Sequence, residues 1–131
     1  MSSKAENTFI AGVHKYLPLA IYREKTNNPY RGGTPDVYYE HRRMMWAEYK
    51  FIEVPKRDST VIVPELSELQ RAWLQRNWEA GHRPLVIVGH AGGGVVFTQP
   101  LAWNAGLRRK DFLESTMSRQ ELAAYISREV S

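Results

Sequence analysis

Two short motifs in the first half of the chain carry residue types that could act together chemically. The first is Gly33-Thr34-Pro35-Asp36 and the second is Glu48-Tyr49-Lys50, with eleven residues between Asp36 and Glu48. They supply two carboxylates and one ammonium. Carboxylate oxygens are ligands that Mg²⁺ prefers, and a fixed ammonium can stabilise negative charge beside them. If the intervening residues form two neighbouring strands, the three groups come together.

This set of groups matches the needs of phosphodiester hydrolysis. The reaction requires a nucleophilic water and neutralisation of the charge that builds on the phosphorus oxygens, and bound Mg²⁺ supplies both. Asp36 and Glu48 would hold the metal, with the backbone carbonyl of Tyr49 as a third ligand. Lys50 falls on the same strand face as Glu48, whereas Tyr49 points into the core. The alternative is that Glu48 and Lys50 form a surface charge pair without a catalytic role.

The strand pattern around the motifs supports their pairing. Residues 36–40 and 44–54 are rich in strand-forming residues, and the charged residues 41–43 between them predict a hairpin turn. The chain leaves along the first strand and returns along the second. The start of the first strand therefore lies beside the later part of the second, where Glu48 falls.

The remaining elements predict a mixed β-sheet flanked by helices. Residues 5–17 have helical spacing, and residues 19–23 form a short strand. Ser67-Glu68-Leu69-Gln70 has the form of a capping box and opens a helix to about residue 80. Two more strands follow at 84–89 and 95–98, and a second capping box at 118–121 opens the last helix. The order α-β-β-β-α-β-β-α is that of an α/β fold.

Composition and charge fit a globular protein with a polyanionic partner. The 131 residues are enough for one domain, and no apolar run could cross a bilayer, so we expect a cytoplasmic protein. The absence of cysteine excludes thiolate zinc sites. Residues 1–57 carry ten Lys and Arg against six Asp and Glu, whereas residues 58–131 carry eight of each kind. The basic excess lies in the half with the acidic motif, although a solvated basic face would look the same.

The two motifs resemble the signature of the PD-(D/E)XK nuclease superfamily. More narrowly, they resemble its VRR-NUC group, which shares a fold with archaeal Holliday-junction resolvases. Residues 66–88 are similar to a helix and strand of that group in which a Gln, matched by Gln70, faces the active centre. Asn77 departs from the pattern, because the family usually has an apolar residue there. The likeness covers residues 5–98, leaves residues 99–131 unassigned, and implies a restriction-endonuclease-like αβββαβ core.

The resemblance also implies partners and one further ligand. The family's first helix carries a Glu that helps to bind metal, and Glu6 matches it. Small stand-alone members, several of them encoded by phages and acting in the host cytoplasm, work as homodimers on branched DNA with Mg²⁺ or Mn²⁺. A twofold dimer would supply the two centres needed to cut both strands of a junction symmetrically.

Three side chains outside the motifs have competing interpretations. Gln70 could complete the capping box with Ser67 or support the active centre. We expect that one orientation cannot do both, and we favour the centre. Trp103 could stack on a base or be buried in a dimer. His14, on the first helix, could approach the centre, but a lone histidine there is more often structural.

Contacts to phosphate would come from residues near the motifs, namely Tyr30, Arg31, Arg42 and Arg43. Arg31 is the foremost of these, because its glycine-rich loop leads directly to Asp36. A solvated loop accounts for the same residues equally well.

The sequence as a whole favours a Mg²⁺-dependent DNA endonuclease that cuts branched or distorted DNA. Asp36, Glu48, Lys50 and Gln70 would form its centre, with Glu6 assisting. The first alternative is a DNA-binding module that keeps the fold without turnover. A metal-dependent enzyme acting on another substrate is the second.

Overall fold

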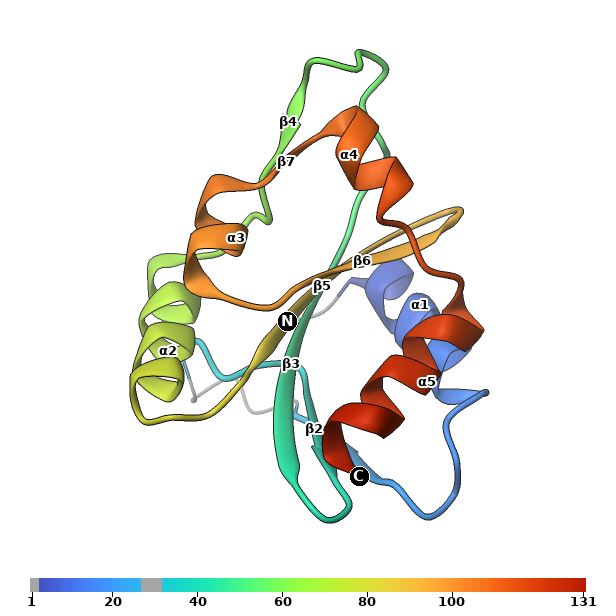
Figure 1. The fold of residues 1–131 in the computed structure, drawn as a ribbon, viewed down its shortest axis with the longest axis vertical. Helices are drawn as coiled ribbons and strands as arrows, with labels where there is room; N and C mark the ends of the chain where they lie inside the picture. Colours follow the sequence, from blue (N-terminus) through green and yellow to red (C-terminus); the bar gives the residue numbers. More distant parts are fainter. Residues whose placement is uncertain (1–2, 27–31) are drawn as a thin grey trace.

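A mixed sheet forms the middle layer of the molecule, and helices cover both of its faces (Figure 1). The computed structural model describes residues 3–26 and 32–131, so the predicted phosphate contacts Tyr30 and Arg31 lie outside the described residues. The architecture is the predicted α/β class. No helix in the described parts of the chain is both long and apolar enough to cross a membrane.

Five strands of the described residues make the main sheet, in the order β1-β2-β3-β5-β6. They are β1 (Tyr22–Lys25), β2 (Val37–Glu40), β3 (Met44–Phe51), β5 (Leu85–His90) and β6 (Gly93–Phe97). Neighbouring strands are antiparallel except for β3 and β5, which run parallel. A parallel pair needs a crossover connection, which contains α2 (Glu68–Glu79). Every residue of β5 is buried, as expected for a central strand.

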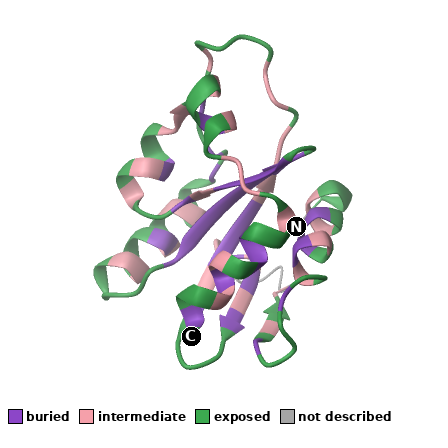
Figure 2. Cartoon of the chain, turned by 45° about the vertical axis from the view of Figure 1, so that its right-hand side comes forward, coloured by how far each residue is buried: buried purple, intermediate pink, exposed green. Residues whose placement is uncertain are grey.

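The helices bury two separate apolar layers against the sheet. One face is covered by α1 (Lys4–His14) and α5 (Arg119–Val130). The other is covered by α2 and by the short helices α3 (Pro100–Ala105) and α4 (Arg109–Glu114). Figure 2 shows the buried strands between helices whose outer sides are exposed.

Each predicted helix and strand is present, but the first helix ends at His14 instead of residue 17, and the first strand begins later than predicted. It starts at Tyr22 instead of residue 19, because the Ile21 N–H donates to the Pro18 carbonyl at 3.1 Å and holds a turn there. Both capping boxes are present. The hydroxyls of Ser67 and Ser118 accept from the backbone N–H groups three residues later and begin α2 and α5.

Residues 99–131, which the family pattern leaves unassigned, pack onto the rest of the described chain. They supply α3, α4, α5 and one strand of a ribbon that the sequence did not predict, β4 (Val61–Ile62) with β7 (Leu107–Arg108). Both interpretations of Trp103 are wrong. Its side chain is 1% exposed and lies in this chain's own core, with its ring 6.4 Å from that of Trp78. It is therefore unavailable to a base or to a second subunit.

Three polar side chains connect α1 to the sheet inside the core. His14 Nε2 lies 2.7 Å from the Tyr39 hydroxyl, which lies 2.6 Å from the Tyr49 hydroxyl. Burial lowers the pKa of His14 to about 4, and the charges of Arg23 and Lys25 act in the same direction. The imidazole is neutral near neutral pH, and its contacts are structural.

Because of His14, the free energy of unfolding should decrease as the pH is lowered from 6.5 to about 4. In this window the unfolded chain binds a proton on the imidazole that the folded protein does not accept, so acid favours unfolding. The loss is at most about 3 kcal/mol, and less where the ring meets solvent. We expect His14→Phe to lack this loss in urea unfolding across the window. His82→Gln, at an exposed histidine, is the matched control, and a His14→Phe variant with wild-type pH dependence would contradict the assignment.

Candidate active site

The β2–β3 hairpin brings Asp36 beside Glu48. Val37 pairs with Ala47 in the antiparallel register, which places Asp36, the residue before β2, next to Glu48. The backbone N–H of Tyr49 donates to Asp36 Oδ2 at 2.8 Å and attaches that carboxylate to β3. The two motifs therefore meet through paired strands.

The second motif holds its carboxylate and its ammonium on one face of β3. Lys50 Nζ lies 3.5 Å from Glu48 Oε2, and the side chain of Tyr49 is buried on the opposite face. This is the alternation of a strand. The side chain of Glu48 is 3% exposed and that of Lys50 is 20% exposed. The ammonium thus reaches solvent while the carboxylate does not.

Gln70 connects α2 to both of these groups. Its Nε2 donates to Glu48 Oε2 at 2.8 Å, and its Oε1 accepts from Lys50 Nζ at 3.2 Å. The same Oε1 accepts from the backbone N–H of Ser67 at 2.9 Å and completes the capping box. The expectation that one orientation could not serve both the cap and the centre is wrong. The amide nitrogen donates to Glu48, while the amide oxygen accepts from both Ser67 and Lys50.

Gly33 allows the loop before Asp36 to pack on the first turn of α2. Its φ is +82°, in the left-handed region that favours glycine, and an added Cβ would lie 2.2 Å from the Leu69 carbonyl oxygen. The next residue of that turn is Gln70. Loop, hairpin and helix thereby bring Asp36, Glu48 and Gln70 to one place.

The Glu48 carboxyl lies in a buried environment that disfavours its ionised form. Burial and, after it, the charge of the neighbouring Asp36 carboxylate raise the pKa of Glu48 to about 8, although the charge of Lys50 acts in the opposite direction. Its Oε1 is buried without a hydrogen-bond partner among the described residues. A buried carboxylate oxygen without a partner is costly unless a proton or a cation neutralises it.

Glu6 lies close enough to this centre to interact electrostatically with its charged groups. It is half-buried in the first turn of α1, where its backbone N–H donates to Ser3 Oγ at 3.1 Å. Burial and, after it, the charge of Asp36 raise the pKa of Glu6, while Lys50 lowers it. Its place matches the assisting role that the family resemblance implies, and that role stays a prediction.

The donor set suits a hard cation such as Mg²⁺. A cation held by Asp36 and Glu48 would satisfy the unpartnered Glu48 oxygen, with the Tyr49 carbonyl as the predicted third ligand. The described residues contain no tight group of three or more His, Cys, Asp or Glu side chains. Water and substrate oxygens would complete the coordination, as Mg²⁺ usually allows.

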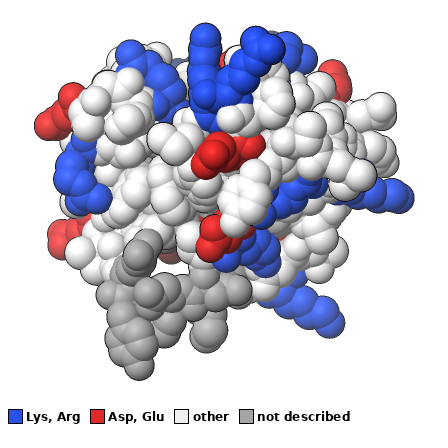
Figure 3. Space-filling model, turned by 90° about the horizontal axis from the view of Figure 1, so that it is seen from below, with Lys and Arg blue, Asp and Glu red and all other residues white. Residues whose placement is uncertain are grey.

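Arg42 and Arg43 are not part of this cluster. Both are exposed in the β2–β3 turn, where their backbone N–H groups donate to the Val130 carbonyl. Glu48 lies roughly 15 Å further along β3. Viewed from below, basic side chains on this face are interrupted by acidic ones (Figure 3). Contact between these arginines and phosphate stays a prediction, and it would have to occur away from the carboxylates.

Two aromatic residues beside the centre were missed at the level of sequence. Trp46 precedes Glu48 by two residues on the same face of β3, and Trp73 follows Gln70 by one turn of α2. Their rings lie 5.4 Å apart. The alternation of β3 would have placed Trp46 on the face of Glu48, but its contact with Trp73 depends on how α2 packs.

Comparison with known proteins identifies the fold. No protein-family model and no curated protein matches this sequence. Among solved structures, the chain is similar to Hjc of Archaeoglobus fulgidus, a Holliday junction resolvase from an archaeal hyperthermophile. The match has a TM-score of 0.56 and 13% sequence identity, and it covers 95% of this chain and 99% of that chain. The protein therefore has the mixed α/β fold of that resolvase.

Proposed function

We propose that this protein is a metal-dependent DNA endonuclease that hydrolyses phosphodiester bonds in branched DNA, such as Holliday junctions. The observation that carries the proposal is the buried Glu48 carboxylate beside Asp36, held by Gln70 and Lys50. Two neighbouring carboxylates inside a protein destabilise it unless their charge is neutralised. A cation-binding role accounts for this arrangement, and the resolvase fold supports branched DNA as the substrate class.

Each residue of the centre has a distinct task in this proposal. Asp36 and Glu48 hold the divalent cation, Mg²⁺ or Mn²⁺, which when bound lowers the pKa of water and draws charge from the phosphate. Lys50, the partly exposed member of the cluster, orients the attacking water and stabilises the charge of the transition state. Gln70 fixes the orientation of Glu48 and Lys50. Glu6 assists from α1.

The finer assignment follows the family resemblance. We place the chain in the VRR-NUC group of the PD-(D/E)XK superfamily and propose a homodimer, because symmetric cutting of a junction needs two centres. Light scattering of the free protein measures that state directly. The resolvase similarity supports this placement through the fold, and the Asp36, Glu48 and Lys50 cluster supports it through the chemistry.

Removing members of the centre should abolish cutting without unfolding the protein. Labelled four-way junctions, flaps, single strands and linear duplexes would be incubated with and without Mg²⁺. We expect Asp36→Ala and Lys50→Ala to lower the cleavage rate by about a hundredfold or more, because each removes charge that the transition state requires. Glu65→Ala is the matched control, since Pro64-Glu65 repeats the Pro-acid pair at an exposed site.

Two results would contradict this proposal in different ways. Junction binding without metal-dependent cutting would favour the DNA-binding module with the same fold. Cutting that survives Asp36→Ala would show that the centre lies elsewhere.

The shared role of Gln70 can be separated from its capping role. Ser67→Ala removes the hydroxyl that accepts from the Gln70 N–H and leaves the contacts of Gln70 with Glu48 and Lys50 in place. We expect it to cost about 1 kcal/mol of stability and to keep activity. Gln70→Ala should cost a similar amount and also lose most of the cleavage rate. Melting curves and initial rates check both, and equal activity of the two variants would remove Gln70 from the centre.

The Glu48 carboxyl should lower the stability of the metal-free protein although cutting requires it. In the metal-free protein near neutral pH, Glu48→Gln removes a carboxyl that folding must keep protonated, whereas the unfolded chain ionises it. We expect the variant to be more stable by up to about 3 kcal/mol in EDTA, with the gain shrinking as the pH falls towards 4.5. Mg²⁺ should raise the melting temperature of the wild type only, and the variant should not cut. A variant less stable than wild type at pH 7 would contradict this account.

A further inference from the structure

A row of aromatic rings crosses the face of the sheet that carries the candidate active site. The ring centroids of Tyr22 and Tyr38 lie 6.3 Å apart, those of Tyr38 and Trp46 5.1 Å, and those of Trp46 and Trp73 5.4 Å. The row, here called the aromatic row, runs from the edge strand β1 across β2 and β3 to α2. Cross-strand pairing explains its central contact, since Tyr38 lies opposite Trp46 in the β2–β3 register.

The aromatic row adjoins the centre directly. Trp46 and Glu48 lie two residues apart on β3 and about 7 Å along it. Trp73 and Gln70 lie three residues apart on α2, which makes them neighbours on that helix surface. The strand β3 and the helix α2 thus carry both the Glu48–Gln70 pair and, next to it, the two indole rings of the aromatic row.

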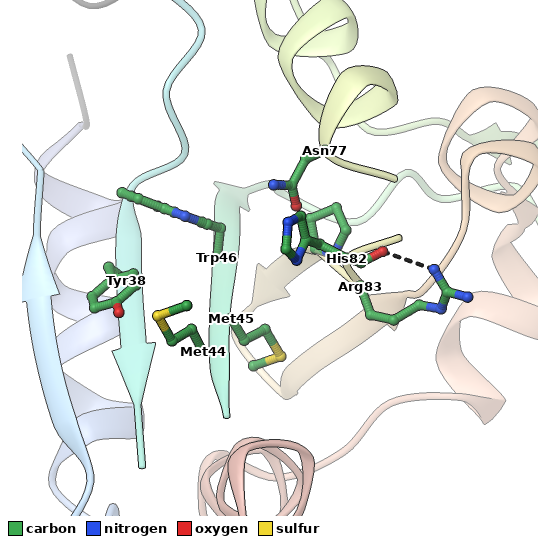
Figure 4. Close-up of a pocket in the computed structure, with 8 residues that line it drawn as sticks. Tyr38, Met44, Met45, Trp46, Asn77, His82 and Arg83 are labelled. Atoms are coloured by element: carbon green, nitrogen blue, oxygen red, sulfur yellow. Dashed lines mark hydrogen bonds between the residues drawn. The ribbon is translucent and has the colours of Figure 1, made fainter. Parts of the chain in front are cut away.

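A pocket of about 180 Å³ opens beside Trp46. It is lined by Tyr38, Met44, Met45, Trp46, Asn77, His82, Arg83 and Pro84. Figure 4 shows Trp46 reaching from β3 toward the strand of Tyr38, with Asn77 and His82 on the other side of β3. The pocket therefore combines flat aromatic and methionine surfaces with an amide, an imidazole and a guanidinium.

Charge distinguishes the two ends of the aromatic row. At the β1 end, the hydroxyls of Tyr22 and Tyr38 donate to the carboxylates of Glu24 and Glu40. At the α2 end, the guanidinium of Arg76 lies 5.5 Å from the centroid of Trp73. A phosphate backbone would be repelled from the first end and attracted to the second.

The pocket lies between the two ends of the row, because Tyr38 lines it from the repelling end and Arg83 adds a cation on the α2 side. The Arg83 guanidinium lies 4.3 Å from the centroid of Trp78 on α2, and Arg83 also lines the pocket. Flat rings, groups that can hydrogen-bond to a planar edge, and nearby cations together match a nucleotide.

We propose that this pocket receives an unpaired nucleobase of the DNA strand that is cut, stacked on Trp46. The inference rests on the proposed nuclease function and names its specificity: the base next to the scissile phosphate must be out of the duplex stack. Asn77 and His82 meet the edge of the base, and Arg83 lies near its phosphate. Paired duplex offers no such base, whereas flaps and single strands do, and a four-way junction supplies one only when a base pair at its branch point opens.

Fluorescence of a base analogue tests the pocket without cutting. The probe is a flapped duplex with one 2-aminopurine at the first unpaired nucleotide, titrated with the full-length protein in EDTA. Stacking on the indole of Trp46 should quench the probe. Trp46→Leu should remove the quenching and weaken binding about tenfold or more. An abasic flap should bind the wild type as weakly as Trp46→Leu binds the intact flap.

A second variant guards against misfolding, because Trp46 also packs on Trp73. Asn77→Phe fills the pocket from a half-buried helix position and leaves the aromatic row intact, so it should reproduce the loss of quenching. Gln75→Phe, at an exposed position of the same helix, is the matched control and should behave like the wild type. Melting curves confirm that each variant is folded.

The outcomes separate this inference from the proposed function. Metal-dependent cutting together with equal binding of intact and abasic flaps would contradict the nucleobase pocket but leave the proposed nuclease function in place. Quenching that depends on Trp46 without any cutting would support the pocket and contradict the nuclease. The absence of DNA binding would overturn both. If Trp46→Leu instead converts a dimer to a monomer in light scattering, the face is a subunit interface and the inference is wrong.

Discussion

The structure depends on one buried carboxylate, that of Glu48. It lies on a central strand, next to a second carboxylate, with one oxygen satisfied by Gln70 and the other without a partner among the described residues. Hydrophobic burial favours the fold around it, whereas desolvation of this group opposes it. The β2–β3 hairpin, the Gly33 turn and the first turn of α2 all hold this carboxylate where solvent does not reach it. A protein without use for a cation would gain stability by replacing it.

Gln70 shows how local and tertiary requirements can be met by one side chain. A capping box needs an acceptor at its third helical residue, and the centre needs a donor toward Glu48. An amide supplies both on separate atoms, which a carboxylate at the same position would not, since it has no donor and would add a third negative charge. The beginning of α2 and the orientation of the centre are consequently determined together.

Local rules predicted most of the elements and the meeting of the motifs. Strand alternation put Glu48 and Lys50 on one face, and the capping boxes located the starts of α2 and α5. The prediction for Trp103 failed because its ring partner Trp78 lies on α2, which is distant from Trp103 in sequence. The β4–β7 ribbon was missed because two-residue strands have no detectable period. The aromatic row was missed because its last contact requires α2 to pack on β3.

The register of β3 decides whether the aromatic row and the centre exist at all. Trp46, Glu48 and Lys50 share one face, and a slip of one residue would turn all three into the core and bring Tyr49 out. Hydrophobic patterning alone resists this weakly, because β3 is largely buried on both faces. The hydrogen bonds between His14 and Tyr39 and between Tyr39 and Tyr49, on the opposite face, supply the missing specificity, since a slip would leave buried polar groups unpaired. The polar contacts on one face of β3 thereby determine that Trp46, Glu48 and Lys50 lie together on the other face.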